Sequence, residues 1–570
     1  MKDVLSFSRD NVFSTTKVVE DDFTSSKNYF VSDKILVHFL QKEFSSDVWS
    51  FIQARLSRLG KSAAMDMDEL SLAADKNPPK LIRRDLFGRD IQKIVYHPAY
   101  NKLLKIAVNE GILSIKWHPK YRMEYKNQLH RMGFSLAFIY GMGESGVSCP
   151  LCMTDGAATI LDKHLPPQDS KRLIEHIYTA DFDDFYTGAM FLTEKSGGSD
   201  VGANQVLAKK VDDATYLLNG EKWFCSNASA EIKLVLARTD AAIKGTQGLS
   251  LFLVENTPFD KEVGRMDYVR LKDKMGVKSM ATAEIIFKDT KATIIGNEGE
   301  GFKIMTEMIN LSRLWNAVIS IAGFRRCMIE AYQFLCYRQT FGKKALEHAL
   351  VRNKLYELAS RYVADFYLTW KTIGMLDKLE GGEEEYRSML RVLIPMVKKQ
   401  TAETSVYGIR ECMELMGGLG YMEEGVVPKF MRDSLVLPIW EGTSNMMVLD
   451  TLRAYAKGEG LERLVNQTKD ALNRKSGMEK ELANLNYVLG QLDTLEVVDR
   501  ETAEYNSKEV FEKITRYIQL GMLINQEDRE SASWIRPTIH WLRQALSDKK
   551  ELIKSPITTE EIIRMIAWGF

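Results

Sequence analysis

The hydrophobic periodicity of this 570-residue chain changes twice, and each change indicates a different kind of secondary structure. Between residues 186 and 296 short apolar or alternating runs, such as 234–237, 249–254 and 284–287, predict β-strands. Several short strands at this spacing are typical of a small barrel or a sandwich. Before and after this stretch, apolar residues recur every three or four positions, which predicts helices that pack together.

The order of these patterns predicts an α+β multidomain fold. We expect a mainly α-helical N-terminal domain at 1–185, a β domain at 186–296, an α-helical bundle at 297–455 and an extra helical C-terminal domain at 456–570. The pair Asn219-Gly220, between strand-like flanks, predicts a β-hairpin turn. The polar run 504–507 predicts a connection between two helices of the C-terminal part.

Charge and composition narrow the functional classes. Lys plus Arg equals Asp plus Glu, at 77 each, so no net charge draws the chain to nucleic acid or an anionic membrane. We expect no membrane span, because no continuous apolar stretch reaches about 18 residues. The N-terminal residues lack a basic-then-apolar signal pattern, and the six cysteines are too sparse for a disulfide scaffold. We therefore expect a cytoplasmic protein, or an organellar one without its presequence.

The sequence contains no pattern that indicates a metal-binding site. The eight histidines form no HxxxH-type cluster. Cys149 and Cys152 are close in sequence, but a structural zinc site needs two further ligands and no second close pair exists. We expect no bound metal and interpret the two cysteines as a buried structural pair.

Three segments carry residue types suited to binding an anionic, planar ligand. The glycine-rich loop 190–201 can bring backbone N–H groups close to a ligand, although it lacks the P-loop lysine. Trp223 and Phe224 lie side by side on a strand and point to opposite faces. The segment 338–343 lies between two predicted helices, and its arginine suits a diphosphate. Each segment taken alone is also compatible with a structural role.

The fourth segment is the densest in candidate residues. It combines the glycine-rich run 411–420 with the stretch 437–445, in which Glu441 stands between Trp440 and Gly442. Burial of a carboxyl raises its pKa and makes the carboxylate a stronger base. The alternative is an exposed loop glutamate, the commonest situation for this residue.

Together these segments resemble the acyl-CoA dehydrogenase family, and within it the AidB-like subgroup. The resemblance is carried by Thr193-Glu194-Lys195-Ser196-Gly197-Gly198-Ser199-Asp200-Val201, Lys222-Trp223-Phe224 and Ile439-Trp440-Glu441-Gly442. Upstream, Asn77-Pro78-Pro79-Lys80-Leu81 and Ser148-Cys149-Pro150-Leu151-Cys152-Met153-Thr154 extend it over most of the chain. The family resemblance implies a β-barrel middle domain, FAD as cofactor and a homotetramer in which a neighbouring subunit completes each FAD site.

The resemblance also implies roles for individual residues. Glu441 matches the catalytic base, which removes the α-proton of an acyl-CoA thioester while flavin N5 takes hydride from the β-carbon. The Glu441 N–H and a flavin ribityl hydroxyl would bind the thioester carbonyl. Arg313 matches an arginine near the CoA chain, although Asn310 and Leu314 replace the usual aspartate and proline. The implied FAD contacts are Leu192, Thr193, Gly198, Ser199, Phe224, Ser226, Trp440, Thr443 and Asn445, with Arg338, Thr340, Phe341, Gly417 and Gly418 from the neighbouring subunit.

The predicted function is FAD-dependent α,β-dehydrogenation of an acyl-CoA in fatty acid metabolism, with an electron acceptor such as electron-transfer flavoprotein. One alternative is an AidB-like, DNA-associated alkylation-response flavoprotein. Residues 457–570 hold 17 Lys plus Arg and 19 Asp plus Glu, a balance of −2 that disfavours DNA binding there. A second alternative, suggested by the altered CoA-contact positions, is a lipid-binding regulator that retains FAD but turns over poorly.

Overall fold

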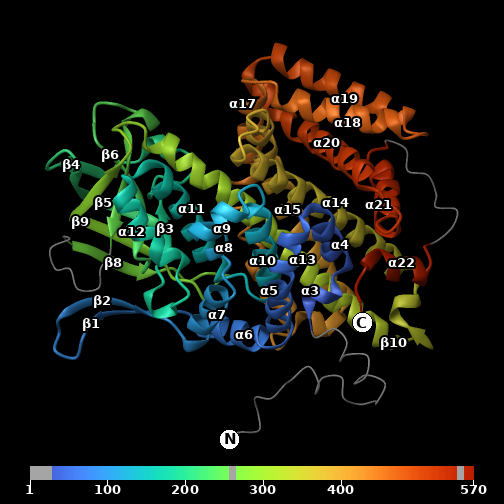
Figure 1. The fold of residues 1–570 in the computed structure, drawn as a ribbon, viewed down its shortest axis with the longest axis horizontal. Helices are drawn as coiled ribbons and strands as arrows, with labels where there is room; N and C mark the ends of the chain where they lie inside the picture. The colour runs from blue at the N-terminus through green and yellow to red at the C-terminus, as the bar shows by residue number, and fades with distance from the viewer. Residues whose placement is uncertain (1–27, 256–264, 548–556, 570) are drawn as a thin grey trace, which may run out of the picture.

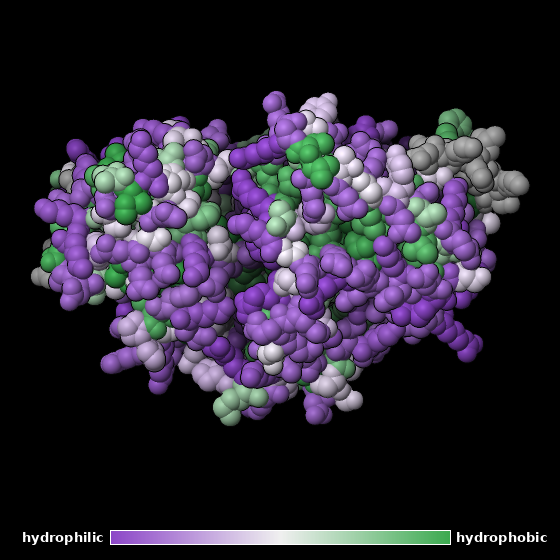
Figure 2. Space-filling model, turned by 90° about the horizontal axis from the view of Figure 1, so that it is seen from above, coloured by the Kyte–Doolittle hydropathy of each residue, from purple (hydrophilic) through white to green (hydrophobic). Residues whose placement is uncertain are grey.

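The computed structural model describes residues 28–255, 265–547 and 557–569. A β-barrel lies at one end of the molecule, long helices fill the middle, and the C-terminal helices pack on the other side (Figure 1). The predicted α+β fold class is confirmed. Seen from above, the mostly hydrophilic face is hollowed between the barrel side and the helical side (Figure 2).

The N-terminal part is mainly helical, as predicted, but it also contains a two-stranded ribbon that the sequence analysis missed. The ribbon pairs β1 (Lys80–Arg84) with β2 (Asp90–Val95) and lies beside the barrel strand β8 (Figure 1). The helices of this part are α3 (Tyr29–Ser32), α4 (Lys34–Glu43), α5 (Ser46–Met65), α6 (Met67–Lys76), α7 (Pro98–Asn109), α8 (Ser114–Trp117), α9 (Pro119–Glu124), α10 (Leu129–Gly143), α11 (Ser148–His164) and α12 (Pro167–Tyr178).

The middle part is a closed barrel of five strands, paired in the order β6-β4-β5-β9-β7 and back to β6. Strands β3 and β8 extend it by pairing with β6 and β9. Apolar side chains such as Phe191, Leu218 and Phe252 fill its core. The strands are β3 (Gly188–Phe191), β4 (Leu207–Lys210), β5 (Thr215–Ser226), β6 (Ile232–Arg238), β7 (Leu249–Glu255), β8 (Arg265–Leu271) and β9 (Thr282–Ile295).

The predicted hairpin turn at Asn219-Gly220 is wrong, because β5 runs through both residues. They form a β-bulge opposite β9, with Gly220 at φ +134°. The Asn219 Nδ2 donates to Asp289 Oδ1 at 2.9 Å, and the Asp289 N–H donates back to Asn219 Oδ1 at 3.0 Å. A Cβ at Gly220 would lie 3.0 Å from the Val206 Cα, so the strand needs glycine there.

The helical bundle and the C-terminal helices follow the barrel. The bundle contains α13 (Gly301–Tyr337), the hairpin β10 (Gln339–Thr340) and β11 (Lys343–Lys344), then α14 (Ala349–Glu380), α15 (Tyr386–Leu415), α16 (Val426–Ser434) and α17 (Ser444–Tyr455). The C-terminal helices are α18 (Gly460–Arg474), α19 (Glu479–Val497), α20 (Arg500–Gln526), α21 (Ala532–Ala545) and α22 (Thr559–Ile566). No helix in the described part of the chain combines the length and apolar character needed to cross a membrane.

The predicted connection at 504–507 is also wrong, since these residues lie inside α20. The break falls earlier, where Asp499 caps α20 by accepting a hydrogen bond from the Thr502 N–H at 3.0 Å. α20 packs against α14 and α17, and Lys399 on α15 forms a 2.7 Å ion pair with Glu512 on α20. The C-terminal helices are therefore attached to the helix that directly follows Glu441.

Candidate active site

Glu441 lies in the loop between α16 and α17, in a backbone conformation that L-residues rarely adopt. Its φ is +58°, and Gly442 follows at +101°. Such conformations cost about 1–3 kcal/mol and persist only where the surrounding structure holds them. Here the Arg313 Nε donates to the Glu441 carbonyl at 3.2 Å, and the Lys398 Nζ donates to the Gly442 carbonyl at 2.7 Å. We call these two cations the carbonyl clamp.

The Glu441 carboxylate faces a cavity whose walls combine apolar and weakly polar groups. Burial raises the pKa of this carboxyl, while a 2.7 Å hydrogen bond from the Ser312 hydroxyl and the nearby charges of Arg313 and Lys398 act against that rise. A raised pKa makes the carboxylate a stronger base. The cavity is partly open to solvent and is lined by Ser145, Ser148, Cys149, Cys152, Met153, Ser312, Trp315, Asn316, Ile319, Leu437, Trp440 and Glu441.

Arg313 was predicted to contact CoA, and in the structure its guanidinium contacts the Glu441 loop and α17. Besides the Glu441 carbonyl, it donates to Asp450 at 2.7 Å and to Asn310 at 3.2 Å, and the side chain is 11% exposed. These contacts attach α13 to both sides of the Glu441 loop. The CoA contact stays a prediction, and the observed role is to hold the loop.

Lys398 was missed by the sequence analysis. Its side chain is fully buried on α15, and this burial lowers the pKa of its ammonium group to about 7. The loop that it contacts lies 44 residues away, and no local pattern in the sequence links the two. Ser312 was missed as well, although it directly precedes the predicted Arg313.

The glycine-rich loop after β3 turns its carbonyl groups into the barrel. Lys222 and Asn204 donate to the Leu192 carbonyl at 3.0 and 2.7 Å, and the Trp223 N–H donates to the Thr193 carbonyl at 2.9 Å. A Cβ at Gly198 would come 2.9 Å from the Thr193 Oγ1, so glycine keeps that hydroxyl accessible. Ser199 follows on the exposed side of the loop. This loop offers a hydroxyl and small residues to a ligand.

A chain of contacts joins the barrel to the Glu441 cavity. The Ser226 and Thr282 hydroxyls lie 3.2 Å apart, and Lys274 donates to Thr282 at 3.2 Å. Burial lowers the pKa of Lys274 to about 8, and its charge acts on the thiol of Cys149, which lines the cavity beside Glu441. Ser226, Thr282, Lys274 and Cys149 therefore form a connected region that leads from the barrel to the Glu441 cavity.

Phe224 and the residues after Glu441 lie at the surface around this region. Phe224 is 56% exposed, with the Lys272 Nζ 4.8 Å from the centroid of its ring. Thr443 is the N-cap residue of α17, and Thr443 and Asn445 are both exposed. Exposed aromatic and polar groups at this position are free to contact a cofactor.

The segment 338–342 lies far from Glu441. α13 carries Arg313 in its first half and ends just before Arg338, 25 residues after Arg313, which corresponds to about 38 Å along a helix. Figure 1 places β10 at the opposite end of the molecule from the barrel. Phe341, at φ +53°, is 97% exposed at the tip of the hairpin, and Thr340 contacts His348 at 3.0 Å. Gly417 and Gly418 are exposed as well, after α15.

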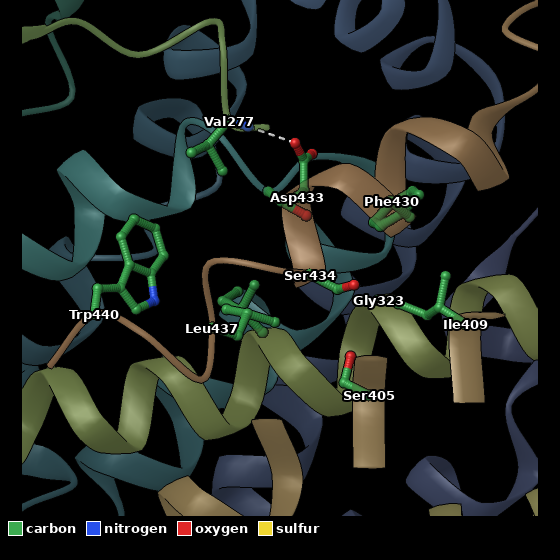
Figure 3. A pocket seen from close by; sticks show the side chains of 11 residues that line it. Val277, Gly323, Ser405, Ile409, Phe430, Asp433, Ser434, Leu437 and Trp440 are labelled. Carbon is green, nitrogen blue, oxygen red and sulfur yellow. Dashed lines mark hydrogen bonds between the residues drawn. The ribbon is translucent and has the colours of Figure 1, made fainter. Parts of the chain in front are cut away.

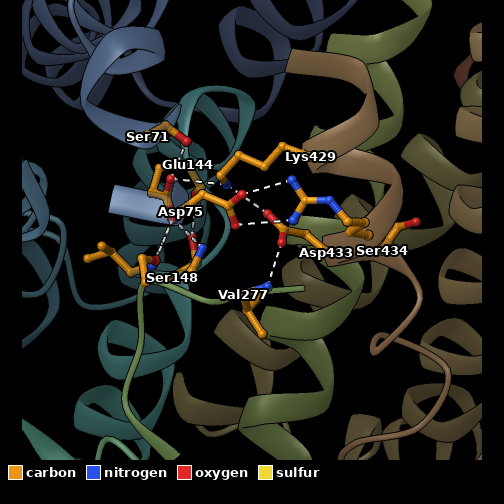
Figure 4. Close-up of polar contacts among 12 residues, drawn as sticks. Ser71, Asp75, Glu144, Ser148, Val277, Lys429, Asp433 and Ser434 are labelled. Atoms are coloured by element: carbon orange, nitrogen blue, oxygen red, sulfur yellow. Dashed lines mark hydrogen bonds and ion pairs between the residues drawn. The ribbon is translucent and has the colours of Figure 1, made fainter. Parts of the chain in front are cut away.

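A buried ion network supports α16, the helix that leads into the Glu441 loop (Figure 4). Lys429 pairs with Asp433 at 2.7 Å and with Glu144 at 3.2 Å, and all three side chains are buried. The Val277 N–H donates to Asp433 at 2.5 Å, and Ser71 donates to Glu144. The network thus joins helices of the N-terminal part, a loop of the barrel part and α16.

Cys149 and Cys152 are free, buried thiols that line the Glu441 cavity. Burial raises the pKa of Cys149 to about 12 and that of Cys152 well above its usual value. Within the described ranges, no three His, Cys, Asp or Glu side chains group as metal ligands. The pair therefore contributes neutral, polarisable walls to the cavity.

A barrel between helical parts, with a buried glutamate in the helical bundle, is the arrangement expected of the acyl-CoA dehydrogenase family, which is a class of FAD-dependent oxidoreductases. Family models agree: residues 22–184 match the adaptive response protein AidB N-terminal domain, and residues 189–290 and 299–456 match the middle and C-terminal domains of acyl-CoA dehydrogenases. The chain is 30% identical over 460 residues to acyl-CoA dehydrogenase family member 11 of Caenorhabditis elegans, covering 78% of this chain and 74% of that protein.

Two further comparisons support the same family. Putative acyl-CoA dehydrogenase AidB of Escherichia coli (strain K12) is 29% identical over 452 residues, covering 78% of this chain and 81% of that protein. The solved structure of Caenorhabditis elegans ACDH-11 in complex with C11-CoA superposes with a TM-score of 0.82 at 26% identity, covering 94% of this chain and 93% of that one. The chain belongs to the acyl-CoA dehydrogenase family, in its AidB-like branch, and is an FAD-dependent oxidoreductase.

Proposed function

We propose that this protein oxidises an acyl-CoA thioester to the trans-2-enoyl-CoA, with Glu441 as the catalytic base. The observation that carries the proposal is the position of Glu441: a carboxylate with a raised pKa, in a clamped left-handed loop, facing a cavity between α11, α13 and the loop 437–441. The ACDH-11 structure that this chain resembles holds C11-CoA, which supports an acyl-CoA as ligand.

Each residue of the site has a separate role in the proposed reaction. The Glu441 carboxylate removes the α-proton of the bound thioester, and its backbone N–H donates to the thioester carbonyl, where negative charge develops. Ser312 holds the carboxylate in one orientation through its 2.7 Å hydrogen bond. The chemistry that bound FAD would supply is acceptance of a hydride, here from the β-carbon. The apolar cavity walls exclude water from the reacting bond.

The residues present fit FAD. The Trp440 Nε1 is buried without a hydrogen-bond partner among the described protein atoms, and Gly198 leaves the Thr193 hydroxyl open. Leu192, Ser199, Phe224, Ser226, Thr443 and Asn445 would complete the contacts to the flavin. We place the four domains at 1–185, 186–296, 297–455 and 456–570, with FAD between the second and the third.

The distant hairpin supports a shared cofactor site. Because Arg338 lies about 38 Å along α13 from Arg313, one chain cannot bring it to its own flavin ring. We therefore assign Arg338, Thr340 and Phe341, with Gly417 and Gly418, to the FAD of a neighbouring subunit in a homotetramer. Glu414, beside this glycine pair, forms a 2.7 Å ion pair with Arg410, which reduces its repulsion of a pyrophosphate. Electron-transfer flavoprotein is the proposed acceptor.

The test is the visible spectrum of the purified protein and its response to a panel of acyl-CoAs. We expect a bound flavin that bleaches with substrate, and we expect Glu441→Gln to keep the flavin but lose bleaching by at least about a thousandfold. Glu462→Gln changes an exposed carboxylate and serves as the control. Retained turnover in Glu441→Gln would remove this residue from the role of base. A bound flavin that no acyl-CoA bleaches would favour the lipid-binding regulator.

A further inference from the structure

A chain of three polar side chains joins the loop before β9 to the end of β5. The Lys274 Nζ donates to the Met280 carbonyl at 2.7 Å and to the Thr282 Oγ1 at 3.2 Å. The Thr282 hydroxyl lies 3.2 Å from the hydroxyl of Ser226, its partner across the β5–β9 pairing. Thr282 is buried, whereas Ser226 is only half-buried. We call Lys274, Thr282 and Ser226 the hydroxyl relay, because it leads from a buried ammonium group to a partly accessible hydroxyl.

The ammonium group sets the direction of the hydrogen bonds in the hydroxyl relay. The distance between two hydroxyls does not show which one donates, but an ammonium group has three donors and no acceptor. The Thr282 oxygen must therefore accept from Lys274, which leaves the single Thr282 hydrogen for the Ser226 oxygen. Within the described residues, neither hydroxyl has another hydrogen-bond partner. The Ser226 hydrogen is then free to be donated to a ligand.

Among the described residues, no carboxylate pairs with Lys274, in contrast to two other lysines of the barrel part. Lys272 pairs with Glu284 at 2.6 Å, and Lys222 pairs with Glu194 at 2.8 Å. Burial lowers the pKa of the Lys274 ammonium group to about 8, so the group is still mainly charged at pH 7. A buried cation is costly unless it is paired. The site therefore suits negative charge that develops on a bound ligand.

The loop that carries Lys274 is fixed to α16. The Val277 N–H donates to Asp433 at 2.5 Å, as Figure 3 shows. Val277 has a φ of +45°, a conformation that a β-branched residue rarely adopts. Asp433 also attracts the charge of Lys274, but its carboxylate is bound by Lys429 at 2.7 Å. The backbone near Lys274 is thus attached to the helical bundle, which holds the ammonium group between the barrel and the bundle.

We propose that Lys274, acting through Thr282, orients the Ser226 hydroxyl as a donor to the flavin and makes reduction of the flavin more favourable. The inference rests on the proposed function, which assigns Ser226 to the flavin. The polar edge of an oxidised isoalloxazine ring presents lone pairs, which need a donor, and acceptance of a hydride adds one negative charge to the ring. A donor chain that begins at an ammonium group stabilises this charge. The hydride comes from the substrate and Lys274 keeps its proton, so Lys274 is a positioning residue.

The test is the reduction potential of the bound flavin, measured on the holoenzyme by chemical reduction against redox dyes, without an acyl-CoA. Lys274→Met should lower the ratio of reduced to oxidised flavin about tenfold at a given dye potential, which corresponds to about 30 mV for a two-electron couple. Thr282→Val keeps the shape of the side chain but removes the hydroxyl, so it should lower the ratio by a similar factor. An unchanged potential in either variant would overturn the proposal, because a lysine or threonine with a purely structural role would not affect it.

A double variant tests whether the charge acts through the hydroxyls. In the Thr282→Val background, Lys274→Met should shift the potential by less than about half of its effect in the unmodified protein. Fully additive shifts would contradict the proposal, because Lys274 would then act without the relay. Lys288→Met is the control: Lys288 lies six residues after Thr282 on β9, about 20 Å along the strand, and pairs with Asp267 at 2.8 Å. It should leave the potential unchanged.

The potential is measured without substrate, so its result is separate from the test of the proposed function. FAD is added back to any variant that loses its flavin during purification. If no acyl-CoA bleaches the flavin of the unmodified protein, the proposed function fails. If acyl-CoA bleaches it but the potential does not depend on Lys274, only this inference fails.

Discussion

Replacing Lys398 by methionine separates what the carbonyl clamp does for the base from what it does for the fold. The Lys398 Nζ donates to the Gly442 carbonyl at 2.7 Å from a fully buried side chain. A hydrogen bond from a charged donor contributes about 1.5–3 kcal/mol. The left-handed backbone at Glu441 and Gly442 costs about 1–3 kcal/mol, which is similar in size. Without Lys398 the loop can therefore relax, and the base leaves its position.

Lys398→Met is expected to lower activity but not the stability of the fold. Burial lowers the pKa of Lys398 from about 10.5 to about 7, and each unit corresponds to about 1.4 kcal/mol. The folded state below pH 7 thus carries a cost of about 5 kcal/mol for keeping this ammonium group charged. Because the folded pKa lies below the unfolded one, this cost falls as the pH rises from 7 to 10.5. Lys398→Met removes it, so the free energy of unfolding at pH 7 should stay constant or rise.

The assay measures acyl-CoA-dependent bleaching and denaturant unfolding on the same preparations. We expect Lys398→Met to lose about ten- to a hundredfold in kcat, with flavin content and stability retained. Lys399→Met is the matched control: Lys399 pairs with Glu403 at 2.8 Å and with Glu512 at 2.7 Å, and contacts no part of the Glu441 loop among the described residues. It should lose about 1 kcal/mol and keep kcat. Full activity in Lys398→Met, or a stability loss larger than that of Lys399→Met, would refute the reasoning.

Three further predictions follow from named contacts. Ser312→Ala removes the hydrogen bond that favours the Glu441 carboxylate, so the acid limb of the kcat/KM profile should move to higher pH, with about a tenfold loss on that side and little change at high pH. Lys429→Met leaves two buried carboxylates unpaired and should cost about 3–5 kcal/mol by denaturant unfolding. Asp365, whose pKa burial raises to about 6, is favoured in its neutral form; stability should fall as the pH rises from about 4 through 6, and Asp365→Asn should remove this fall of up to about 3 kcal/mol in a pH series.

The barrel and the helices could be predicted because their patterns are local. The apolar run 249–254 and the helix face that includes Leu311 and Trp315 express the periods of their elements directly. The hairpin at Asn219-Gly220 could not be resolved in this way. The decisive contact comes from Asp289, 70 residues further along, which fixes the pair as a bulge inside β5. The β1–β2 ribbon was missed because its polar, largely exposed strands show no alternation.

The distinction between local patterns and long-range contacts also explains which residues of the candidate site the sequence analysis identified. Trp440 and Glu441 stand next to each other in one segment, so the motif identifies them. Ser312 and Lys398 reach that segment from 129 and 44 residues away, and no sequence signal links them to it. Local residue order indicates the base, whereas its partners are set by tertiary packing.

The reactivity of Glu441 follows from this packing. Burial raises the pKa of its carboxyl, while Ser312, Arg313 and Lys398 act in the opposite direction. A fully solvated glutamate would be too weak a base, and one buried without these partners would be held protonated near neutral pH. Two of the three partners also bind the loop carbonyls or the helix beside them, so the groups that tune the base are those that fix its position. A variant that changes the pKa of Glu441 should therefore also change the position of its loop. Paired measurements of kcat and of the pH profile can establish this.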